Sequence, residues 1–124
     1  MLKFVPVNYN ELGAPFDSDN TLNGYMGYDL NDNSRYCGKC VFRLKGYSME
    51  ILFVEVMDND PETIEGLIRS ALNFGGNRNV YIAEFKAEQG IDVAVMLGFE
   101  PENDVLSGDI PTLLKGSCCK GKQV

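Results

Sequence analysis

The chain contains no histidine and no tryptophan among its 124 residues. The absence of histidine excludes Ser-His-Asp and Cys-His nucleophilic sites, together with metal sites that need an imidazole ligand. No segment approaches the roughly 18 consecutive apolar residues of a membrane-spanning helix. The opening MLKFVPVNYN has no apolar core of the kind found in signal peptides. We therefore expect no membrane partner and a cytoplasmic location.

Positive charges are scarce, because 11 lysines and arginines stand against 18 aspartates and glutamates, for a net charge of −7. Nucleic acids and anionic membrane surfaces are bound through basic patches, and this composition gives no such patch. Neither the P-loop nor the dinucleotide-binding glycine pattern is present. We expect no nucleic-acid partner, and any anionic ligand would have to bind against the net charge of the protein.

The hydrophobic content of 44% and the charged content of 23% are typical of globular proteins. A chain of this length forms a hydrophobic core without disulfides or metal ions. We find no internal repeat and no linker rich in proline, glycine or serine. The sequence therefore predicts a single domain over residues 1–124.

One strand and one helix dominate the pattern. The run MEILFVEV, within a strand predicted at residues 47–56, is apolar on both faces, as a central strand requires. Asp60 and Pro61 form a typical helix start, and the glycines at 75 and 76 form a typical end. Between them, apolar residues recur at helical spacing on one face, namely Ile64, Leu67, Ile68, Ala71 and Leu72. A helix over residues 61–74 is predicted to pack this face on the sheet.

The remaining segments complete an order of three strands, a helix, a strand, a helix and a last strand. A polar loop is predicted at residues 8–23, and Lys45 and Gly46 are predicted to form a two-residue turn. A second helix is predicted within residues 87–97, with Ile91, Ala94 and Val95 on its apolar face. Further strands are predicted at residues 3–7, 23–30, 36–44, 79–83 and near Val105.

This order, with LIRSALNFGG closing the first helix and MLGFE after the second, resembles the GNAT superfamily of acyl-CoA N-acyltransferases. The resemblance extends over about residues 24–100. It implies an α+β fold with a mixed, mostly antiparallel sheet, two main helices, and a sheet that opens between its fourth and fifth strands. The helices that the family places between its first two strands are missing here, so the chain resembles a reduced and divergent member.

The resemblance also implies a function. It suggests acetyl transfer from acetyl-CoA to an unknown amine on a small molecule or a peptide. In the family, the acyl-pantetheine arm binds the backbone at the end of the fourth strand, which here comprises Phe53, Val54, Glu55, Val56 and Met57. A homodimer could complete the acceptor pocket that the missing helices would otherwise form.

Glu50 is the candidate general base, because a strand glutamate has this role in the family. By strand alternation, Glu50 is predicted on the same face as Leu52 and Val54, and opposite to Glu55. The alternative is a structural one, in which Glu50 pairs across the hairpin with Arg43 or Lys45.

Three departures from the family pattern oppose acetyl-CoA binding. The glycine-rich loop that holds the pyrophosphate is replaced by a segment with four carboxylates, those of Asp58, Asp60, Glu62 and Glu65. Pro61 lacks an N–H donor, and Ala94 stands where the family has a tyrosine general acid. These residues predict weak or absent binding of acetyl-CoA. The alternative function is therefore a non-catalytic domain that binds a small ligand or a protein.

The cysteines invite a zinc-site interpretation, since Cys37 and Cys40 form a C-x-x-C pair and Cys118 and Cys119 are adjacent. Along a regular strand, however, the thiols of Cys37 and Cys40 point to opposite faces. We expect Cys40 to be a core residue. The sequence predicts no structural metal and no obligatory disulfide.

Overall fold

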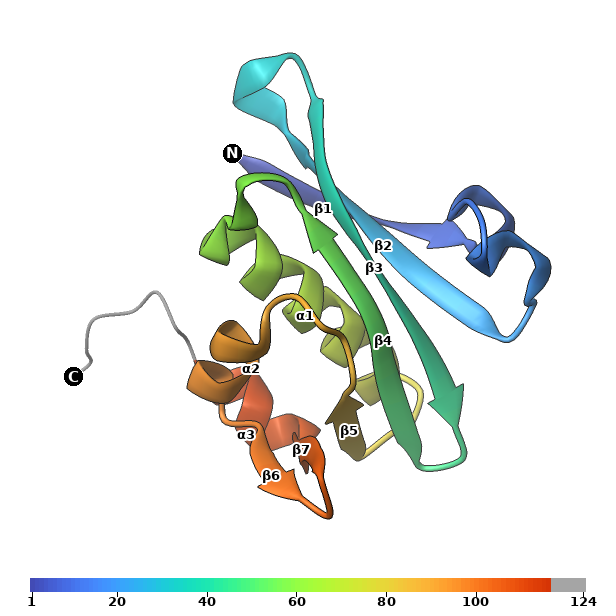
Figure 1. Cartoon of the computed structure of the whole chain (residues 1–124), viewed down its shortest axis with the longest axis vertical. Coiled ribbons are helices and arrows are strands. Elements are labelled where there is room, and N and C mark those ends of the chain that lie inside the picture. Colours follow the sequence, from blue (N-terminus) through green and yellow to red (C-terminus); the bar gives the residue numbers. More distant parts are fainter. Residues whose placement is uncertain (117–124) are drawn as a thin grey trace.

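The structure is a computed structural model that describes residues 1–116. Its strands form one sheet in the order β1-β2-β3-β4-β5-β7-β6, so β4 is central, as predicted (Figure 1). The strands are β1 (Leu2–Asn8), β2 (Leu22–Asp29), β3 (Arg35–Lys45), β4 (Ser48–Val56), β5 (Ile82–Phe85), β6 (Glu100–Glu102) and β7 (Val105–Asp109). The helices are α1 (Pro61–Gly76), α2 (Ile91–Leu97) and α3 (Ile110–Lys115).

The sheet is mixed and mostly antiparallel, which confirms the predicted fold class. Strands β1 to β4 form an antiparallel meander, and β7 pairs antiparallel with both β5 and β6. The pair β4 and β5 is parallel, because α1 carries the chain across the sheet between them. Short 3₁₀ turns, η1 (Tyr9–Glu11) and η2 (Phe16–Ser18), occupy the segment between β1 and β2. The N-terminal part is therefore reduced, as predicted.

Helix α1 packs its apolar face on the meander. The carboxylate of Asp60 accepts the N–H of Thr63 at 3.1 Å and so caps the helix start. The predicted face is buried in the main core, with Ile64, Leu67, Ile68, Ala71 and Leu72 at most 1% exposed. Residues of α2 and α3 belong to the same core. One face of the sheet is thus covered by helices.

The opposite face of the sheet is covered by the segment between β1 and β2. Leu12 is buried there beside Leu22 and Val41, and Phe16 stacks near Phe53 with ring centroids 5.0 Å apart. Lys39 donates from Nζ to the carbonyl oxygen of Leu12 at 2.6 Å, which ties the segment to β3. This loop takes the place of helices as a cover for the second face.

A β-bulge in β4 changes which side chains share a face. Val41 lies opposite Phe53 and Phe42 lies opposite Ile51, which leaves Leu52 as an extra residue. Residues opposite each other on neighbouring strands point to the same face. Glu50 and Glu55 therefore share a face, and Val54 points to the helical side. The predicted alternation was wrong here, because it assumed a regular strand from Glu50 to Glu55.

Two further local predictions need correction. The hairpin turn is Gly46 and Tyr47, one residue later than predicted, because Lys45 pairs with Ser48 and Gly46 has a φ of 64°. Strand β5 begins at Ile82 rather than at residue 79. Residues 77–80 instead close the end of α1, where the N–H of Val80 bonds to the carbonyl of Gly75 at 3.0 Å.

Helix α2 is shorter than predicted and buries a different face. It begins at Ile91, and its buried residues are Val93, Ala94 and Leu97, whereas Ile91 and Val95 are about half exposed. Six of its seven residues are apolar, so periodicity could not select a face. The short helix α3 was not predicted.

The Ile68→Ala substitution tests the packing of α1. Ile68 is fully buried in the main core, so truncation leaves a cavity, and we expect a loss of about 2–5 kcal/mol in the free energy of unfolding. Denaturant unfolding measures this loss. The control Asn73→Ala removes an exposed side chain of the same helix and should change stability by less than about 0.5 kcal/mol. Equal small effects of both substitutions would contradict the helical face assigned here.

Candidate functional site

The candidate site is the gap where β4 and β5 separate. The two strands pair only from Ser48 to Ile51 and from Ile82 to Phe85. The last backbone bond between them runs from the N–H of Lys86 to the carbonyl of Ile51, at 2.8 Å. Beyond this point β4 continues through the bulge to Val56, while the chain after β5 turns toward α2 (Figure 1). The pairing between the fourth and fifth strands therefore ends partway along β4, and Val54 and Val56 beyond this point are buried, at 3% and 6% exposed.

The backbone of β4 presents two residues to this gap. Val56 uses both its N–H and its C=O on the β5 side, where the side chain of Gln89 bonds to them. Because strand residues alternate, Val54 presents its N–H and C=O to the same side. Phe53 and Glu55 alternate with these residues and lie opposite Val41 and Lys39 of β3. Of the five predicted backbone positions, Val54 and Val56 thus face the gap.

The last predicted position, Met57, lies beyond the strand. It begins the 3₁₀ turn η4 (Met57–Asn59), and its side chain is 54% exposed. Asp58 and Asn59 in this turn have positive φ values of 60° and 51°. The turn reverses the chain between β4 and α1, so Met57 does not continue the edge of the strand.

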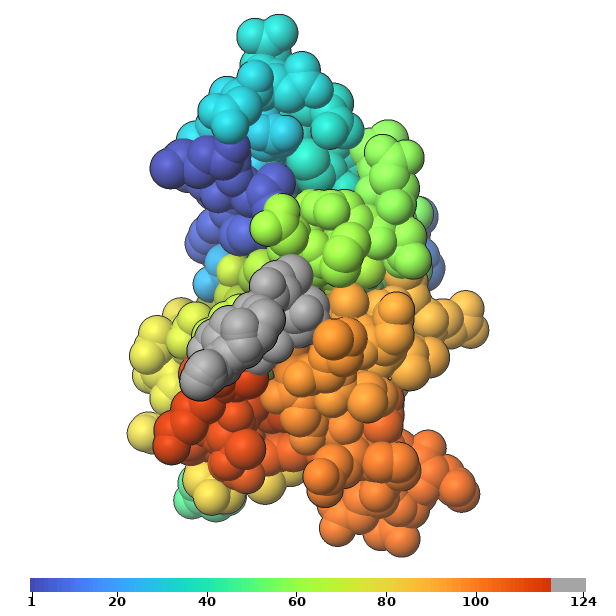
Figure 2. All heavy atoms as spheres, turned by 90° about the vertical axis from the view of Figure 1, so that its left-hand side faces the viewer, coloured from blue at the N-terminus to red at the C-terminus, as the bar shows by residue number. Residues whose placement is uncertain are grey.

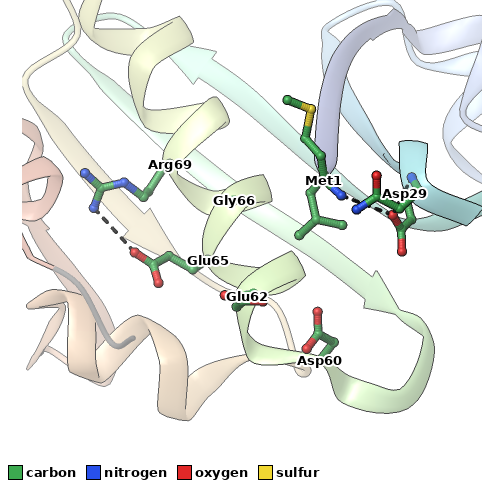
Figure 3. A pocket seen from close by; sticks show the side chains of 9 residues that line it. Met1, Asp29, Asp60, Glu62, Glu65, Gly66 and Arg69 are labelled. Carbon is green, nitrogen blue, oxygen red and sulfur yellow. Dashed lines mark hydrogen bonds and ion pairs between the residues drawn. The ribbon is translucent and has the colours of Figure 1, made fainter. Parts of the chain in front are cut away.

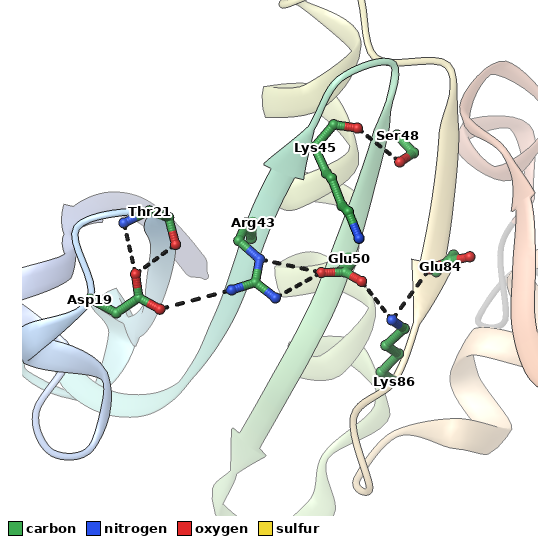
Figure 4. A network of polar contacts seen from close by, with 8 residues as sticks. All are labelled: Asp19, Thr21, Arg43, Lys45, Ser48, Glu50, Glu84 and Lys86. Carbon is green, nitrogen blue, oxygen red and sulfur yellow. Dashed lines mark hydrogen bonds and ion pairs between the residues drawn. The ribbon is translucent and has the colours of Figure 1, made fainter.

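Glu50 lies at the centre of a polar network on the face opposite the helices (Figure 4). Arg43, directly across the hairpin, donates to Oε1 at 3.0 Å, and Lys86 donates to Oε2 at 2.5 Å. Arg43 also approaches Asp19 at 3.8 Å, and Lys86 approaches Glu84 at 3.5 Å. The structural pairing with Arg43 that the sequence suggested is present. Lys86 is a second partner that sequence reasoning missed.

The electrostatics of the network fix Glu50 as a carboxylate. The hydrogen bond from Lys86 has the largest effect in lowering the pKa of Glu50; burial opposes it, and the bond from Arg43 lowers the pKa further. The same bond raises the pKa of Lys86. With two cations bound to it and a lowered pKa, the Glu50 carboxylate is a weak proton acceptor in this arrangement.

A pocket of about 590 Å³ lies beside the start of α1 (Figure 3). Asp60, Glu62 and Glu65 line it, and Asp29 of β2 adds a fourth carboxylate that was not predicted. The predicted Asp58 lines a neighbouring pocket. Figure 2 shows the green residues at the start of α1 between the blue N-terminal residues and the orange residues of α2.

The first turn of α1 offers little to an anion. Pro61 has no N–H, and the N–H of Thr63 is already bound by the carboxylate of Asp60 at 3.1 Å. The N–H of Ile64 bonds to the carbonyl of Asp60 at 3.0 Å. The helix start thus already holds a carboxylate of its own, and the surrounding carboxylates repel a second anion.

Comparison with solved structures identifies the fold. An N-acetyltransferase from Staphylococcus aureus superposes with a TM-score of 0.69 over 90% of this chain and 99% of its own, at 13% identity. A spermidine/spermine N-acetyltransferase from Vibrio cholerae gives 0.64 over 93% and 98%, at 12% identity. The chain has a divergent GNAT-like fold. No protein-family model and no curated protein sequence matches the chain.

A further structure with this fold contains coenzyme A. An N-acetyltransferase from Thermoplasma acidophilum, solved in complex with coenzyme A, superposes with a TM-score of 0.58 at 10% identity. That match covers 74% of this chain and 63% of the other.

None of the helices within residues 1–116 has the length and the apolar character that a membrane span requires.

Ala94, Cys37 and Cys40, which the sequence analysis also singled out, are all buried. Ala94, where the family has its tyrosine, is fully buried in the core. Cys37 and Cys40 are buried free thiols, and burial raises the pKa of Cys40 to about 12. Gly27 pairs with Gly38 and Tyr28 pairs with Tyr36, so Cys37 lies in a bulge of β3. The strand is therefore not regular there, and alternation does not tell us on which faces the two thiols lie.

The remaining cysteine prediction concerns residues 118 and 119, which lie outside the described residues. Within residues 1–116, no three His, Cys, Asp or Glu side chains are grouped so as to hold a metal ion.

The Glu50→Gln substitution tests the network. At pH 7 it removes a carboxylate bound to two cations, and we expect a loss of about 1–3 kcal/mol in stability. Because the pKa of Glu50 is lowered in the folded state, the wild-type advantage should be complete above the ordinary value of 4.5 and disappear as the pH falls through the lowered pKa. Unfolding curves from pH 7 to pH 3 measure this.

The control is Glu84→Gln, which removes one 3.5 Å ion pair at a side chain 38% exposed. An exposed pair of this kind contributes about 0–1 kcal/mol. A loss for Glu50→Gln that does not vary with pH would show that the network does not stabilise the fold through the charge of Glu50.

Proposed function

We propose that this GNAT-like protein binds an acyl-pantetheine thioester along the edge of β4 and transfers the acyl group to an amine. The observation that carries the proposal is that β4 continues beyond β5, so that the backbone of Val54 and Val56 faces a gap with no strand paired to it. Pantetheine is a chain with two amides, and amides are the groups that an open strand edge binds. Neighbouring structures that are N-acetyltransferases support acyl transfer as the chemistry.

The reaction needs few groups from the protein. The neutral amine nitrogen attacks the thioester carbonyl, a C–N bond forms, the C–S bond breaks, and the thiolate leaves with the bonding electrons. The nitrogen loses one proton to water as the amide forms. A backbone N–H of β4 would stabilise the negative charge on the carbonyl oxygen during the attack. Thiols are acidic compared with alcohols, with a pKa near about 8.5 for cysteine, so water can protonate the thiolate. The lack of a tyrosine at Ala94 therefore does not prevent turnover.

Glu50 is the proposed base in this reaction, with one condition. In its present bonds to Arg43 and Lys86 it is a weak acceptor. A cationic amine that replaced Lys86 beside the carboxylate could pass a proton to Glu50, directly or through water.

The proposed acceptor is a cationic amine on a small molecule or peptide. The net charge of −7 favours the approach of cations. Two of the solved neighbours are spermidine or spermidine/spermine N-acetyltransferases, and a polyamine is therefore the first acceptor to test.

The proposed donor is held by its pantetheine arm alone. A carboxylate about 6 Å from a phosphate charge opposes binding by roughly 0.7–2.8 kcal/mol, for an effective dielectric constant between 80 and 20. Asp60 and Glu62 lie at the start of α1, where the GNAT superfamily holds the pyrophosphate. The 3′-phosphoadenosine diphosphate of acetyl-CoA should therefore weaken its binding here.

Calorimetric titration with S-acetylpantetheine and with acetyl-CoA tests this proposal. At low salt we expect S-acetylpantetheine to bind at least threefold more tightly, which corresponds to one weak charge repulsion. Added salt should reduce the difference, because it screens exposed charges. If acetyl-CoA binds tenfold more tightly than S-acetylpantetheine, the proposal that the pantetheine arm alone holds the donor is refuted.

A pair of variants separates repulsion from other causes. Glu62→Gln removes one carboxylate from the start of α1 and should tighten acetyl-CoA binding without affecting S-acetylpantetheine. Glu100→Gln removes an exposed carboxylate from β6 and should change neither affinity.

A second function is a non-catalytic domain that binds an amide-containing ligand without turnover. The observation that favours it is the engagement of Glu50 by two cations. Steady-state assays with S-acetylpantetheine and spermidine decide between the two functions. Turnover that Glu50→Gln reduces at least 100-fold in kcat, with folding retained, supports the enzyme; ligand binding without any turnover supports the non-catalytic domain.

A further inference from the structure

The carboxamide of Gln89 occupies part of the open edge of β4. Its Oε1 accepts the N–H of Val56 at 2.9 Å, and its Nε2 donates to the C=O of the same residue at 3.1 Å. A residue in an antiparallel ladder exchanges the same two bonds with its partner. The side chain of Gln89 therefore pairs with Val56 as a residue of a neighbouring antiparallel strand would.

A third hydrogen bond holds the carboxamide in place from the other side. Nε2 also donates to Oδ1 of Asn59 at 2.9 Å, in the turn η4. Gln89 lies 33 residues from Val56 in the sequence, in the segment between β5 and α2, and is only partly exposed. The three bonds thus connect the two sides of the gap at its open end.

The carboxamide covers Val56 but not Val54. Residues two apart on one strand are separated by about 6.6–6.8 Å along it. Within residues 1–116, no side chain is bonded to the backbone of Val54 in the way that Gln89 is bonded to Val56. Of these two residues, Val56 is therefore the one whose backbone a side chain already pairs, and Val54 is buried in the core at 3% exposed.

We infer that Gln89 is a specificity-determining residue that a ligand must displace in order to reach Val56. The inference rests on the proposed function, since it concerns the same edge. A chain with a single trans amide supplies only one of the two bonds that Gln89 makes to Val56, because its N–H and C=O point in opposite directions. A chain with two amides, such as pantetheine, can replace the carboxamide with the N–H of one amide and the C=O of the other.

The exchange replaces two neutral amide hydrogen bonds to Val56 with two others of the same kind, so it is reversible. Val56 has one N–H and one C=O bonded before and after the exchange, so the ligand gains only what Gln89 gives up. Removing the carboxamide eliminates this competition. Two neutral hydrogen bonds of ordinary net strength correspond to a change in affinity of about 30-fold, within a range of about 5- to 150-fold.

The experiment compares S-acetylpantetheine binding by the wild type, Gln89→Ala and Glu88→Ala. We expect Gln89→Ala to bind at least about fivefold more tightly. Glu88→Ala, which shortens the exposed neighbouring side chain, should bind like the wild type. Gln89→Asn, which keeps the amide but shortens its reach, should also bind more tightly and serves if the alanine variant unfolds. Equal or weaker binding by the Gln89 variants overturns the inference, because Gln89 would then be a spectator or a ligand contact.

A second measurement separates this inference from the proposed function. Hydrogen exchange of the Val56 amide, followed by NMR without any ligand, reports whether Gln89 covers the edge. Exchange at least fivefold faster in Gln89→Ala than in Glu88→Ala supports the cover, and unchanged exchange overturns it. If no variant binds S-acetylpantetheine, the proposed function fails, and this exchange rate alone decides whether Gln89 occupies the edge.

Discussion

Beyond Ile51, the central strand of this protein has no strand on its β5 side, and its backbone groups still need hydrogen-bond partners. The last bond to the β5 segment comes from Lys86, three residues before Gln89. The bulge at Leu52 lies at the same level and reorients the strand. Much of the candidate site follows from this one constraint. The gap exists because the pairing stops, and Gln89 lies in the gap because Val56 has an N–H and a C=O to bond.

The same constraint accounts for the two ion pairs of Glu50. It lies in the last paired stretch, on the face opposite the helices, where Arg43 and Lys86 reach it from either side. A carboxylate that is 5% exposed requires such partners. The arrangement stabilises the ionised form and reduces its basicity at the same time. For this reason any catalytic use of Glu50 depends on an incoming cation that changes its set of partners.

Much of the architecture could be predicted from local patterns. The face of α1 was readable because its apolar residues recur at helical spacing between a clear start at Asp60 and a glycine end. The central place of β4 followed from its apolar character on both faces. The bulge was not readable, because Leu52 is one of several apolar residues in a row and no glycine marks it. The bonds of Gln89 and Lys86 to β4 were not readable either, since they join residues 33 and 36 positions apart.

The short pairing between β4 and β5 has a further consequence, for the cooperativity of the fold. The sheet consists of a four-stranded meander and a three-stranded unit of β5, β7 and β6, joined by four pairs of residues. Helix α1 packs on the strands of the meander and on helices α2 and α3. Sub-global opening should therefore begin along this seam, where few backbone bonds must break, before either unit unfolds. A ligand bound along the edge of β4 would change the free energy of that opening. The length over which β4 and β5 pair therefore sets both the extent of the candidate site and the local stability of the sheet.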